Sequence, residues 1–392
     1  MIVLTLNNGS SSLKFGLYRA DGDEPRALMS GEAERGKLSA TDAAGVEMPE
    51  VAFGGEVADE AVGAIAKRIA DAGLPPPQAI GHRIVHGGPN LLEHRRIDDR
   101  VMRELEAARA FSPLHAAAAL ALIHKAQAAF PALPQVACFD TVFHARLPDV
   151  ARTLPIAREL SGEGLHRYGF HGLSCESIVR QLRGALPPRL VIAHLGSGAS
   201  ITAVRDGHSI DTSMGLTPTG GVIMAARSGD LDPGVLIYLM RERGYDAARL
   251  EQLIDHRSGL LGISGLSTDM RALHAAAPNN PDARLAVEMF CLSVAKSIAG
   301  MVIPLGGVDT LVFTGGIGEH DAAVREAIGA HLRWMGFILD ERHNRSAQTN
   351  IESPGSRSRV MVLPSQEDEQ IARHVANLID PDRTAGARAA GR

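Results

Sequence analysis

The sequence is poor in aromatic residues and in long runs of one charge. Aromatic side chains make up 4% of the 392 residues, with one tryptophan, so stacking platforms for nucleic-acid bases are not expected. No long run of Lys or Arg occurs, and the formal net charge is −5. A basic surface for nucleic acid or for an anionic membrane is therefore not expected either.

Cysteine is also scarce, and leader-like or very long apolar segments are lacking. Cys138, Cys175 and Cys291 are far apart, odd in number and form no CxxC pair, which excludes a disulfide framework or a zinc knuckle. We expect three reduced, buried thiols in a cytoplasmic protein. The start, Met1–Asn8, lacks the basic lead and cleavage site of a signal peptide, and no stretch reaches the roughly 18 apolar residues of a membrane span.

What the chain does contain is a mixture of strand and helix patterns, which predicts an α/β fold. Residues 2–6 and 13–18 read as two strands joined by a Gly/Ser turn, and residues 190–193 and 201–204 repeat this pattern. Aligning Gly9 with Gly196 superposes the two units, a weak internal repeat that predicts a duplicated fold. The length suggests two domains or one large two-lobed fold.

Glycine-rich turns follow three apolar strands, at residues 7–12, 196–200 and 315–318. Such turns let the backbone approach a ligand and present N–H groups to anions, but tight hairpins use the same residues. From the residues alone, a phosphate cradle and plain turns both remain open. Walker, dinucleotide-binding and protein-kinase motifs are absent from the sequence.

Arginine and histidine cluster beside glycine in several short segments. Residues 81–88 hold Arg83 between two histidines, and residues 224–233 hold Arg227. His171 and His194 also stand next to glycines or one residue from them. A guanidinium binds carboxylate or phosphate through two parallel hydrogen bonds, so the clustering indicates an anion site.

Along nearly its whole length, roughly residues 2 to 378, the chain resembles the acetate kinase family of the sugar kinase, Hsp70 and actin superfamily. The motifs that carry the resemblance are Asn7–Lys14, His82–Gly88, Pro113–His115, Phe139–His144, Tyr168–Gly172, Asp211–Gly215, Arg227–Pro233, Ser258–Gly265 and Phe313–Glu319. The resemblance implies a two-lobed, duplicated ribonuclease-H-like fold (actin/Hsp70/sugar kinase) with an interlobe cleft. It also implies an N-terminal lobe of residues 1–142 plus 368–392 and a C-terminal lobe of residues 143–367, the latter carrying the nucleotide-binding and dimerisation surfaces.

The implied activity is a phosphotransferase with a carboxyl group as acceptor: ATP and acetate give ADP and acetyl phosphate, reversibly and by direct in-line transfer. Arg83 and Arg227 match the arginines that hold the carboxylate and the phosphoryl group, and His171 matches the histidine on the phosphoryl oxygens. Asp140 matches an aspartate near the acetate, which we interpret as an orienting group because acetate is already ionised at pH 7. Asn7 and Glu367 match the residues at the family's Mg²⁺, for which Mn²⁺ is an alternative.

The resemblance assigns further residues to the two substrates. The pocket for the methyl group of the acid is implied to contain Val85, Leu114, Phe170 and Pro218. The ATP site is implied to contain Ser12, Lys14, His194, Gly196, Ser197, Gly198, Asp269, Met270, Arg271, Gly316 and Ile317. The chain departs from the family at Ser197, where Asn is usual, at Cys175 and at His320, so substrate preference is less defined than the reaction class. A homodimer is also implied.

Three alternatives remain open at this stage. The chain could phosphorylate propionate or butyrate, since one methylene changes binding by only about 1–3 kcal/mol. Its 16 histidines could serve a metal hydrolase, although no HExxH or HxH spacing occurs. A nucleotide-binding sensor without catalysis is the third.

Overall fold

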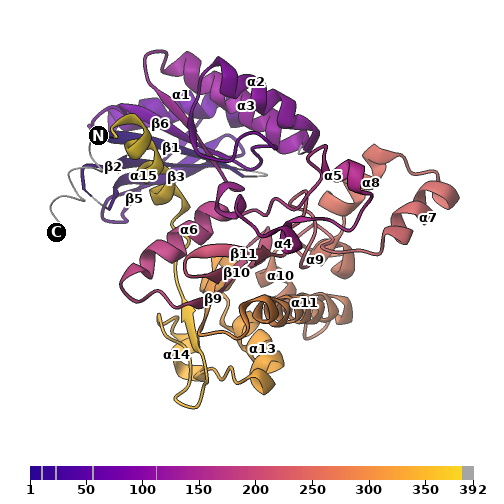
Figure 1. Cartoon of the computed structure of the whole chain (residues 1–392). Helices are drawn as coiled ribbons and strands as arrows, with labels where there is room; N and C mark the ends of the chain where they lie inside the picture. The colour runs from indigo at the N-terminus through magenta and orange to yellow at the C-terminus, as the bar shows by residue number, and fades with distance from the viewer. Residues whose placement is uncertain (10–11, 23, 55–56, 112, 382–392) are drawn as a thin grey trace. The chain divides into compact units, whose positions relative to one another are not determined.

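The computed structural model describes residues 1–9, 12–22, 24–54, 57–111 and 113–381, of which 57–59 and 113–115 are described by backbone alone (Figure 1). The chain forms two compact units. Unit 1 contains Met1–Val142 and Gln366–Arg392, and unit 2 contains Phe143–Ser365. From the sequence we expected the second boundary after Glu367, whereas the structure assigns Glu367 to unit 1.

Unit 1 is built on an eight-stranded sheet with the order β5-β4-β3-β2-β1-β6-β8-β7. Its strands are β1 (Ile2–Asn8), β2 (Leu13–Arg19), β3 (Arg26–Glu34), β4 (Lys37–Asp42), β5 (Glu47–Ala52), β6 (Ala79–Ile84), β7 (Arg95–Arg96) and β8 (Gln135–Phe139). Strand β1 pairs antiparallel with β2 and parallel with β6, and β6 pairs parallel with β8. Continuous burial along β1 and β8 fits strands covered on both faces.

Helices cover both faces of this sheet. They are α1 (Val57–Asp71), α2 (Asp99–Ala107), the 3₁₀ turn η1 (Ala108–Phe111), α3 (Pro113–Ala129) and α15 (Glu367–Ile379). Helices α1 and α3 pack on each other and share a core with β1–β4 and Ile80. The next residue, Gly81, faces α15, because a Cβ atom there would lie 2.4 Å from Ile371 and 2.7 Å from Val375. This close packing places the start of α15, and so Glu367, against the central strands β1 and β6.

Unit 2 is built on a five-stranded sheet with the order β11-β10-β9-β12-β13. Its strands are β9 (Arg189–Leu195), β10 (Ala199–Arg205), β11 (His208–Thr212), β12 (Thr310–Thr314) and β13 (Arg359–Val362). The antiparallel hairpin β9–β10 and the parallel partners β12 and β13 match β1–β2, β6 and β8 of unit 1 in order and direction. The predicted duplicated ribonuclease-H-like α/β fold is therefore confirmed.

The helices of unit 2 are more numerous than the sequence patterns indicated. They are α4 (Asp149–Arg152), α5 (Arg158–Ser161), α6 (Gly172–Gln181), α7 (Pro233–Arg243), α8 (Ala247–His256), α9 (Gly259–Ser264), α10 (Met270–Ala276), α11 (Pro281–Leu305), α12 (Gly315–His320), α13 (Ala322–Leu332) and α14 (Glu341–Arg345). Short 3₁₀ turns add η2 (Val142–His144), η3 (Arg183–Ala185) and η4 (Arg333–Met335). The predicted turn at residues 315–318 is wrong, because Gly315 alone turns the chain, with φ 77°, and α12 starts there.

Helix α11 is long and apolar enough to cross a membrane by length and composition, which we did not expect from the sequence. Nine of its 25 residues are buried. It packs against α9, α10 and α13 and against strand β10, as the core helix of a globular unit does. This packing explains the apolar character of its buried side, while Leu285, Leu292 and Ile303 are exposed. The prediction of three buried thiols is confirmed, since Cys138, Cys175 and Cys291 are all buried.

Candidate functional site

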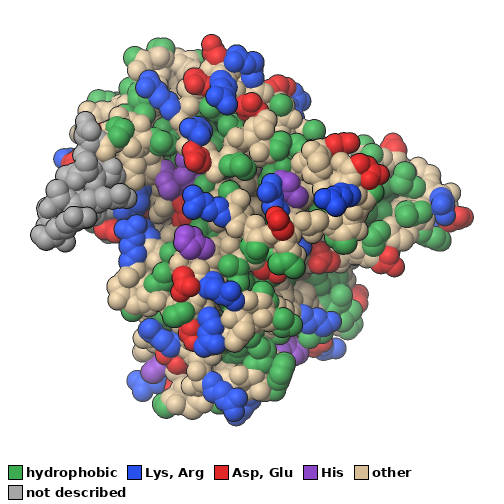
Figure 2. Space-filling model, in the orientation of Figure 1, with side chains coloured by type: hydrophobic (Ala, Val, Ile, Leu, Met, Phe, Trp, Pro, Cys, Tyr) green, Lys and Arg blue, Asp and Glu red, His purple; other side chains and the backbone are tan. Residues whose placement is uncertain are grey.

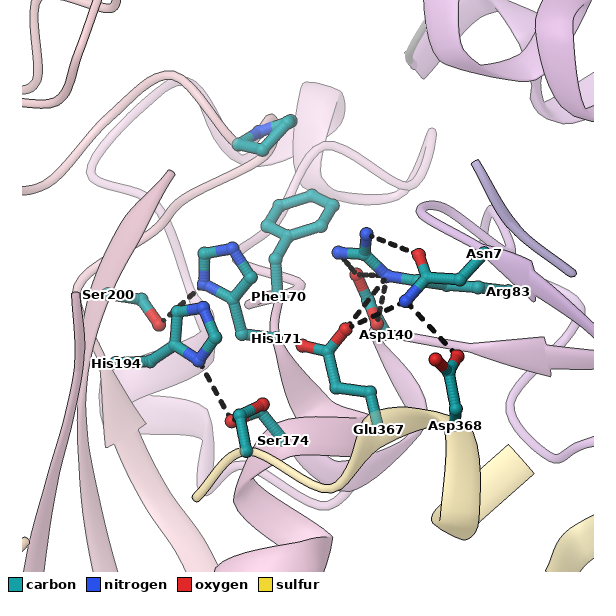
Figure 3. Close-up of polar contacts among 12 residues, drawn as sticks. Asn7, Arg83, Asp140, Phe170, His171, Ser174, His194, Ser200, Glu367 and Asp368 are labelled. Carbon is teal, nitrogen blue, oxygen red and sulfur yellow. Dashed lines mark hydrogen bonds and ion pairs between the residues drawn. The ribbon is translucent and has the colours of Figure 1, made fainter. Parts of the chain in front are cut away.

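In unit 1, polar side chains gather at the carboxyl ends of three adjacent strands. Asn7 lies near the end of β1, Arg83 near the end of β6, and Asp140 directly after β8 (Figure 3). The carboxyl ends of neighbouring parallel strands meet at one sheet edge, where α/β folds place their ligands. The fold, rather than sequence proximity, therefore brings these three predicted site residues together.

Arg83 and Asp140 form a buried, bidentate ion pair. The Nε and Nη2 atoms of Arg83 donate to Asp140 Oδ2 at 3.0 and 2.6 Å, and Nη1 donates to Asn7 Oδ1 at 3.1 Å. The side chain of Asp140 is 1% exposed and that of Arg83 15%. Burial by itself lowers the pKa of Arg83, but Asp140 and Glu367 outweigh it and hold that pKa above its ordinary value. Asp140 thus fixes the guanidinium in a charged, oriented state.

An acidic group stands next to this pair at the first turn of α15. Asn7 Nδ2 donates to Glu367 Oε2 at 3.2 Å and contacts Asp368 Oδ1 at 3.5 Å (Figure 3). Burial, followed by the charges of Glu367 and Glu369, raises the pKa of Asp368 to about 7. Loss of solvation and the two acidic neighbours thus outweigh the hydrogen bond from Asn7 and the charge of Lys14. The carboxylate oxygens of Glu367 and Asp368 fit Mg²⁺, which prefers oxygen ligands and keeps several waters, whereas the amide oxygen of Asn7 accepts from Arg83.

Asp368 was missed as a site residue from the sequence. The sequence pattern that could have indicated it was present, since residues 367–369 are three consecutive acidic residues at the start of a helix. Acids in a first helical turn are common for their effect on the helix dipole alone, so the run did not stand out.

The other predicted site residues of unit 1 are Ser12, Lys14, Val85 and Leu114. Lys14 lies opposite Asn7 in the β1–β2 hairpin, and its charge offsets a small part of the rise in the pKa of Asp368. The hydroxyl of Ser12 donates to Glu32. Val85 is half-buried just beyond β6. Leu114 lies in the first turn of α3, but its side chain is outside the described part of the chain, as are Ser10 and Ser11 of the first glycine-rich turn.

In unit 2, the second glycine-rich turn is surrounded by cationic and hydrogen-bonding groups. The turn joins β9 to β10 and is closed by Gly196 N–H, which donates to Gly198 O at 3.0 Å. A Cβ atom at position 198 would lie 3.1 Å from His171 Nε2 and 3.4 Å from Arg227 Nη1. Three predicted site residues, Gly198, His171 and Arg227, are thus brought together. Glycine leaves open the space between these two side chains.

His171 and His194 form a stacked pair, with ring centroids 4.2 Å apart and planes inclined by 19°. The Nδ1 atom of His171 bonds to Ser200 Oγ at 3.0 Å, and that of His194 bonds to Ser174 Oγ at 2.8 Å (Figure 3). His171 caps α6 in the left-handed region, with φ 57°. A non-glycine residue held there is strained, and such strain concentrates at functional sites.

The loop that carries Arg227 is fastened to the glycine-rich turn. Ala225 N–H donates to Ser197 O at 3.2 Å, and Arg227 Nη1 contacts Pro218 O at 3.4 Å. Ser197, which replaces the family's usual Asn, is exposed, and its backbone carbonyl holds this loop. Pro218 is buried, as is Phe170, which is 1% exposed.

The residues predicted to contact the adenosine of ATP lie at the starts of two helices, α10 and α12. Gly316 N would lie 4.0 Å from a Cβ atom at position 196, so the start of α12, with Ile317 following, borders the glycine-rich turn. In α10, Arg271 pairs with Asp269 at 2.8 Å and is 90% exposed. Met270 is 3% exposed, which leaves its side chain in the core.

Glu319 is a further residue of this region that sequence analysis placed in a motif without a role. Its Oε1 atom accepts hydrogen bonds from Gly315 N–H and Ser365 N–H, each at 2.9 Å. Glu319 therefore connects Gly315, the first residue of α12, to the segment after β13.

Comparisons with known proteins show the family of the chain. A family model described as the acetokinase family matches residues 2–373. An acetate kinase of Methylocella silvestris is 40% identical, with 96% of this chain and 98% of the relative covered. A solved propionate kinase from Francisella tularensis is 36% identical with a TM-score of 0.90, covering 96% of this chain and 99% of that one. A solved acetate kinase from Porphyromonas gingivalis is 33% identical with a TM-score of 0.84, covering 97% and 100%. The chain belongs to the acetokinase family.

Proposed function

We propose that this protein catalyses the reversible, Mg²⁺-dependent transfer of the terminal phosphoryl group of ATP to acetate, giving acetyl phosphate and ADP. The observation that carries the proposal is the meeting of His171 Nε2 and Arg227 Nη1 at the Gly198 backbone. Phosphoryl transfer needs positioning and stabilisation of charge on the equatorial oxygens, and these two donors supply both. Membership in the acetokinase family supports the same reaction.

The acid needs orientation more than activation. Acetate is ionised at neutral pH, so its carboxylate is already a nucleophile and no strong general base is required. Asp140 is engaged with Arg83 through three hydrogen bonds, which suits an orienting role better than proton transfer. Arg83, held in this way, is proposed to bind the carboxylate of the acid or an oxygen of the phosphoryl group.

Asn7 and Glu367 are proposed to hold the divalent cation, with Asp368 as an additional oxygen donor beside them. When bound, Mg²⁺ or Mn²⁺ would neutralise phosphate charge and shield the acidic cluster. His194, Gly196, Ser197 and Gly198 are proposed to bind the ATP phosphates, with Ser12 and Lys14 also assigned to ATP. Asp269, Met270, Arg271, Gly316 and Ile317 are assigned to its adenosine side.

Acetate is proposed as the preferred acid, with propionate as the specific alternative. Val85, Leu114, Phe170 and Pro218 are all apolar and are assigned to the alkyl group of the acid. One methylene is worth only about 1–3 kcal/mol in such a pocket. The name of the Francisella tularensis protein, a propionate kinase, keeps the longer acid as a real alternative.

The test is to trap the acyl phosphate as a hydroxamate with ATP and Mg²⁺, using formate, acetate, propionate and butyrate at matched concentrations. The proposal predicts the highest kcat/KM for acetate. A maximum at propionate would change the acid but keep the reaction class. ATP binding without any acid-dependent ADP release would refute the proposal and favour a nucleotide sensor. Activity that survives magnesium removal but not a zinc chelator would favour a hydrolase.

A homodimer formed through unit 2 is also proposed. Helix α7 buries none of its residues, although Val235, Ile237, Tyr238 and Met240 are apolar and 43–53% exposed. Figure 2 shows hydrophobic side chains over the part of the surface that α7 occupies in Figure 1. An apolar surface of this kind is typical of a contact between subunits. A location in the cytoplasm is also proposed, because three distant cysteines with no CxxC pair fit a reducing compartment.

A further inference from the structure

Two buried serine hydroxyls contact the stacked imidazoles of unit 2, and neither serine was assigned a role above. Ser200 is 1% exposed and Ser174 is fully buried. We infer that Ser200 and Ser174 are positioning residues that set the tautomers of His171 and His194, so that both rings direct Nε2–H toward the phosphoryl oxygens at the glycine-rich turn. The inference rests on the proposed phosphoryl transfer, because it assigns these rings to that anion.

A serine hydroxyl can donate to or accept from Nδ1, and the inference makes it the donor in both pairs. A neutral imidazole has one N–H donor and one acceptor nitrogen. If a serine hydroxyl donates to Nδ1, the ring proton must reside on Nε2. For His194, Ser365 Oγ lies 3.1 Å from Ser174 Oγ, and Ser174 Oγ lies 2.8 Å from Nδ1. Donation from Ser365 to Ser174 leaves the Ser174 proton for His194.

The Nε2 atoms of both rings border the same turn. A Cβ atom would lie 3.1 Å from His171 Nε2 if built at Gly198, and 3.8 Å from His194 Nε2 if built at Gly196. An anion seated on this turn is therefore within reach of a donor from each ring. The tautomer with the proton on Nδ1 would instead present a lone pair to the anion and repel it.

The choice of serine rather than a carboxylate also has a physical reason. A carboxylate on Nδ1 favours the imidazolium form, whereas a hydroxyl adds no charge. Two imidazolium rings with centroids 4.2 Å apart would repel each other by about 4 kcal/mol at an effective dielectric constant of 20. Hydroxyl partners therefore allow both rings to stay neutral and still donate.

The surrounding chain holds this arrangement from several sides. His144 bonds through Nε2 to Phe170 O at 3.0 Å and through Nδ1 to Ser209 Oγ at 2.8 Å, next to the strained His171. Ser365 N–H donates to Glu319, which also accepts from Gly315 N–H. These contacts fix the chain around His171 and His194, and phosphoryl transfer requires groups that are held in a fixed orientation.

The experiment compares Ser200→Ala and Ser174→Ala with the conservative Ser200→Thr. Ser358→Ala is the matched control, since Ser358 is a buried serine of unit 2 whose hydroxyl donates to Val308 O at 2.8 Å. Loss of a transition-state donor costs about 100- to 1000-fold in kcat, so partial misorientation of a ring should cost about 10- to 100-fold. We expect this fall in kcat with little change in the KM for ATP, recovery in Ser200→Thr, and no effect of Ser358→Ala.

A second readout is independent of activity. Nitrogen-15 spectra of histidine-labelled protein should show both rings with the proton on Nε2, and a shift toward the Nδ1–H form for the ring whose serine is replaced. In a His194→Ala background, Ser174→Ala should have no further effect on kcat. Unchanged spectra together with unchanged kcat would overturn the inference. If the wild-type chain makes no acyl phosphate, the proposed function fails, and the spectra still decide whether the serines set the tautomers.

Discussion

Replacing Gly198 by alanine is the sharpest test of the anion site in unit 2. The added methyl group would lie 3.1 Å from His171 Nε2 and 3.4 Å from Arg227 Nη1. Because Gly198 does not adopt a left-handed φ, its backbone accepts alanine without strain. The substitution therefore fills the space between His171 and Arg227, and the His171 ring must move by a few tenths of an ångström to admit it.

The expected loss follows from the hydrogen bonds that the methyl group obstructs. A hydrogen bond to a charged group contributes about 1.5–3 kcal/mol. Obstructing one such bond in the transition state should lower kcat/KM by roughly 10- to 150-fold, since each 1.36 kcal/mol is a factor of ten. The midpoint of thermal unfolding should stay near that of the wild type.

The assay is acetyl phosphate formation at varied ATP and acetate, alongside a thermal unfolding scan. Gly300→Ala is the matched control, because Gly300 lies in α11 and a Cβ atom there meets nothing within 4 Å. Alanine in a helix should stabilise that variant by about 0.5–1 kcal/mol and leave activity unchanged. A Gly198→Ala enzyme within twofold of the wild type would show that His171 and Arg227 do not share an anion there.

Other predictions concern unit 1 and the apolar helix. Asp140→Ala removes the nearest carboxylate partner of Arg83, with Glu367 still 3.9 Å away, and should lower the free energy of unfolding by about 3–5 kcal/mol in chemical denaturation. A loss below 1 kcal/mol would contradict a structural role for the pair. Burial lowers the pKa of His82 from 6.5 to about 4, so the unfolded chain binds its proton first as pH falls. Stability should therefore drop between about pH 6.5 and 4, with a smaller slope in His82→Gln, and equal slopes would refute this origin. Glu367→Gln should raise the Mg²⁺ concentration needed for half-maximal rate, while Glu326→Gln, at an exposed position of α13, should not. Ile237→Glu should shift light-scattering mass from dimer to monomer, and an unchanged mass would exclude α7 from the contact.

Local features of this fold were predictable because short-range physics determines them. The hairpin of β1 and β2 follows from two apolar runs flanking a Gly/Ser turn, and α15 follows from its amphipathic spacing. Helix α12 was not predictable in this way. Its glycines read as a turn, and only the strand before it and the packing after it make residues 315–320 helical.

The site was predictable only through resemblance, because its contacts are long-range. Arg83 and Asp140 are 57 positions apart and meet because β6 and β8 are parallel neighbours. No periodicity in the sequence specifies that pairing. The same holds for Ser200 and His171, whose hydrogen bond depends on the placement of β10 beside the start of α6. Asp368 shows the opposite case, since its neighbours were visible but its burial was not.

The return of the chain to unit 1 at Gln366 has a consequence for synthesis on the ribosome. Domains usually fold as they emerge, amino end first. Here the sheet of unit 1 lacks the helix that packs on Gly81 until Ile371 and Val375 have been made. A nascent chain must therefore complete the whole of unit 2 while the first-made sheet keeps one apolar face uncovered. Premature termination would yield a protein that lacks Glu367 and Asp368 and leaves this apolar face of the sheet exposed. Such a protein would be a substrate for chaperones and proteases.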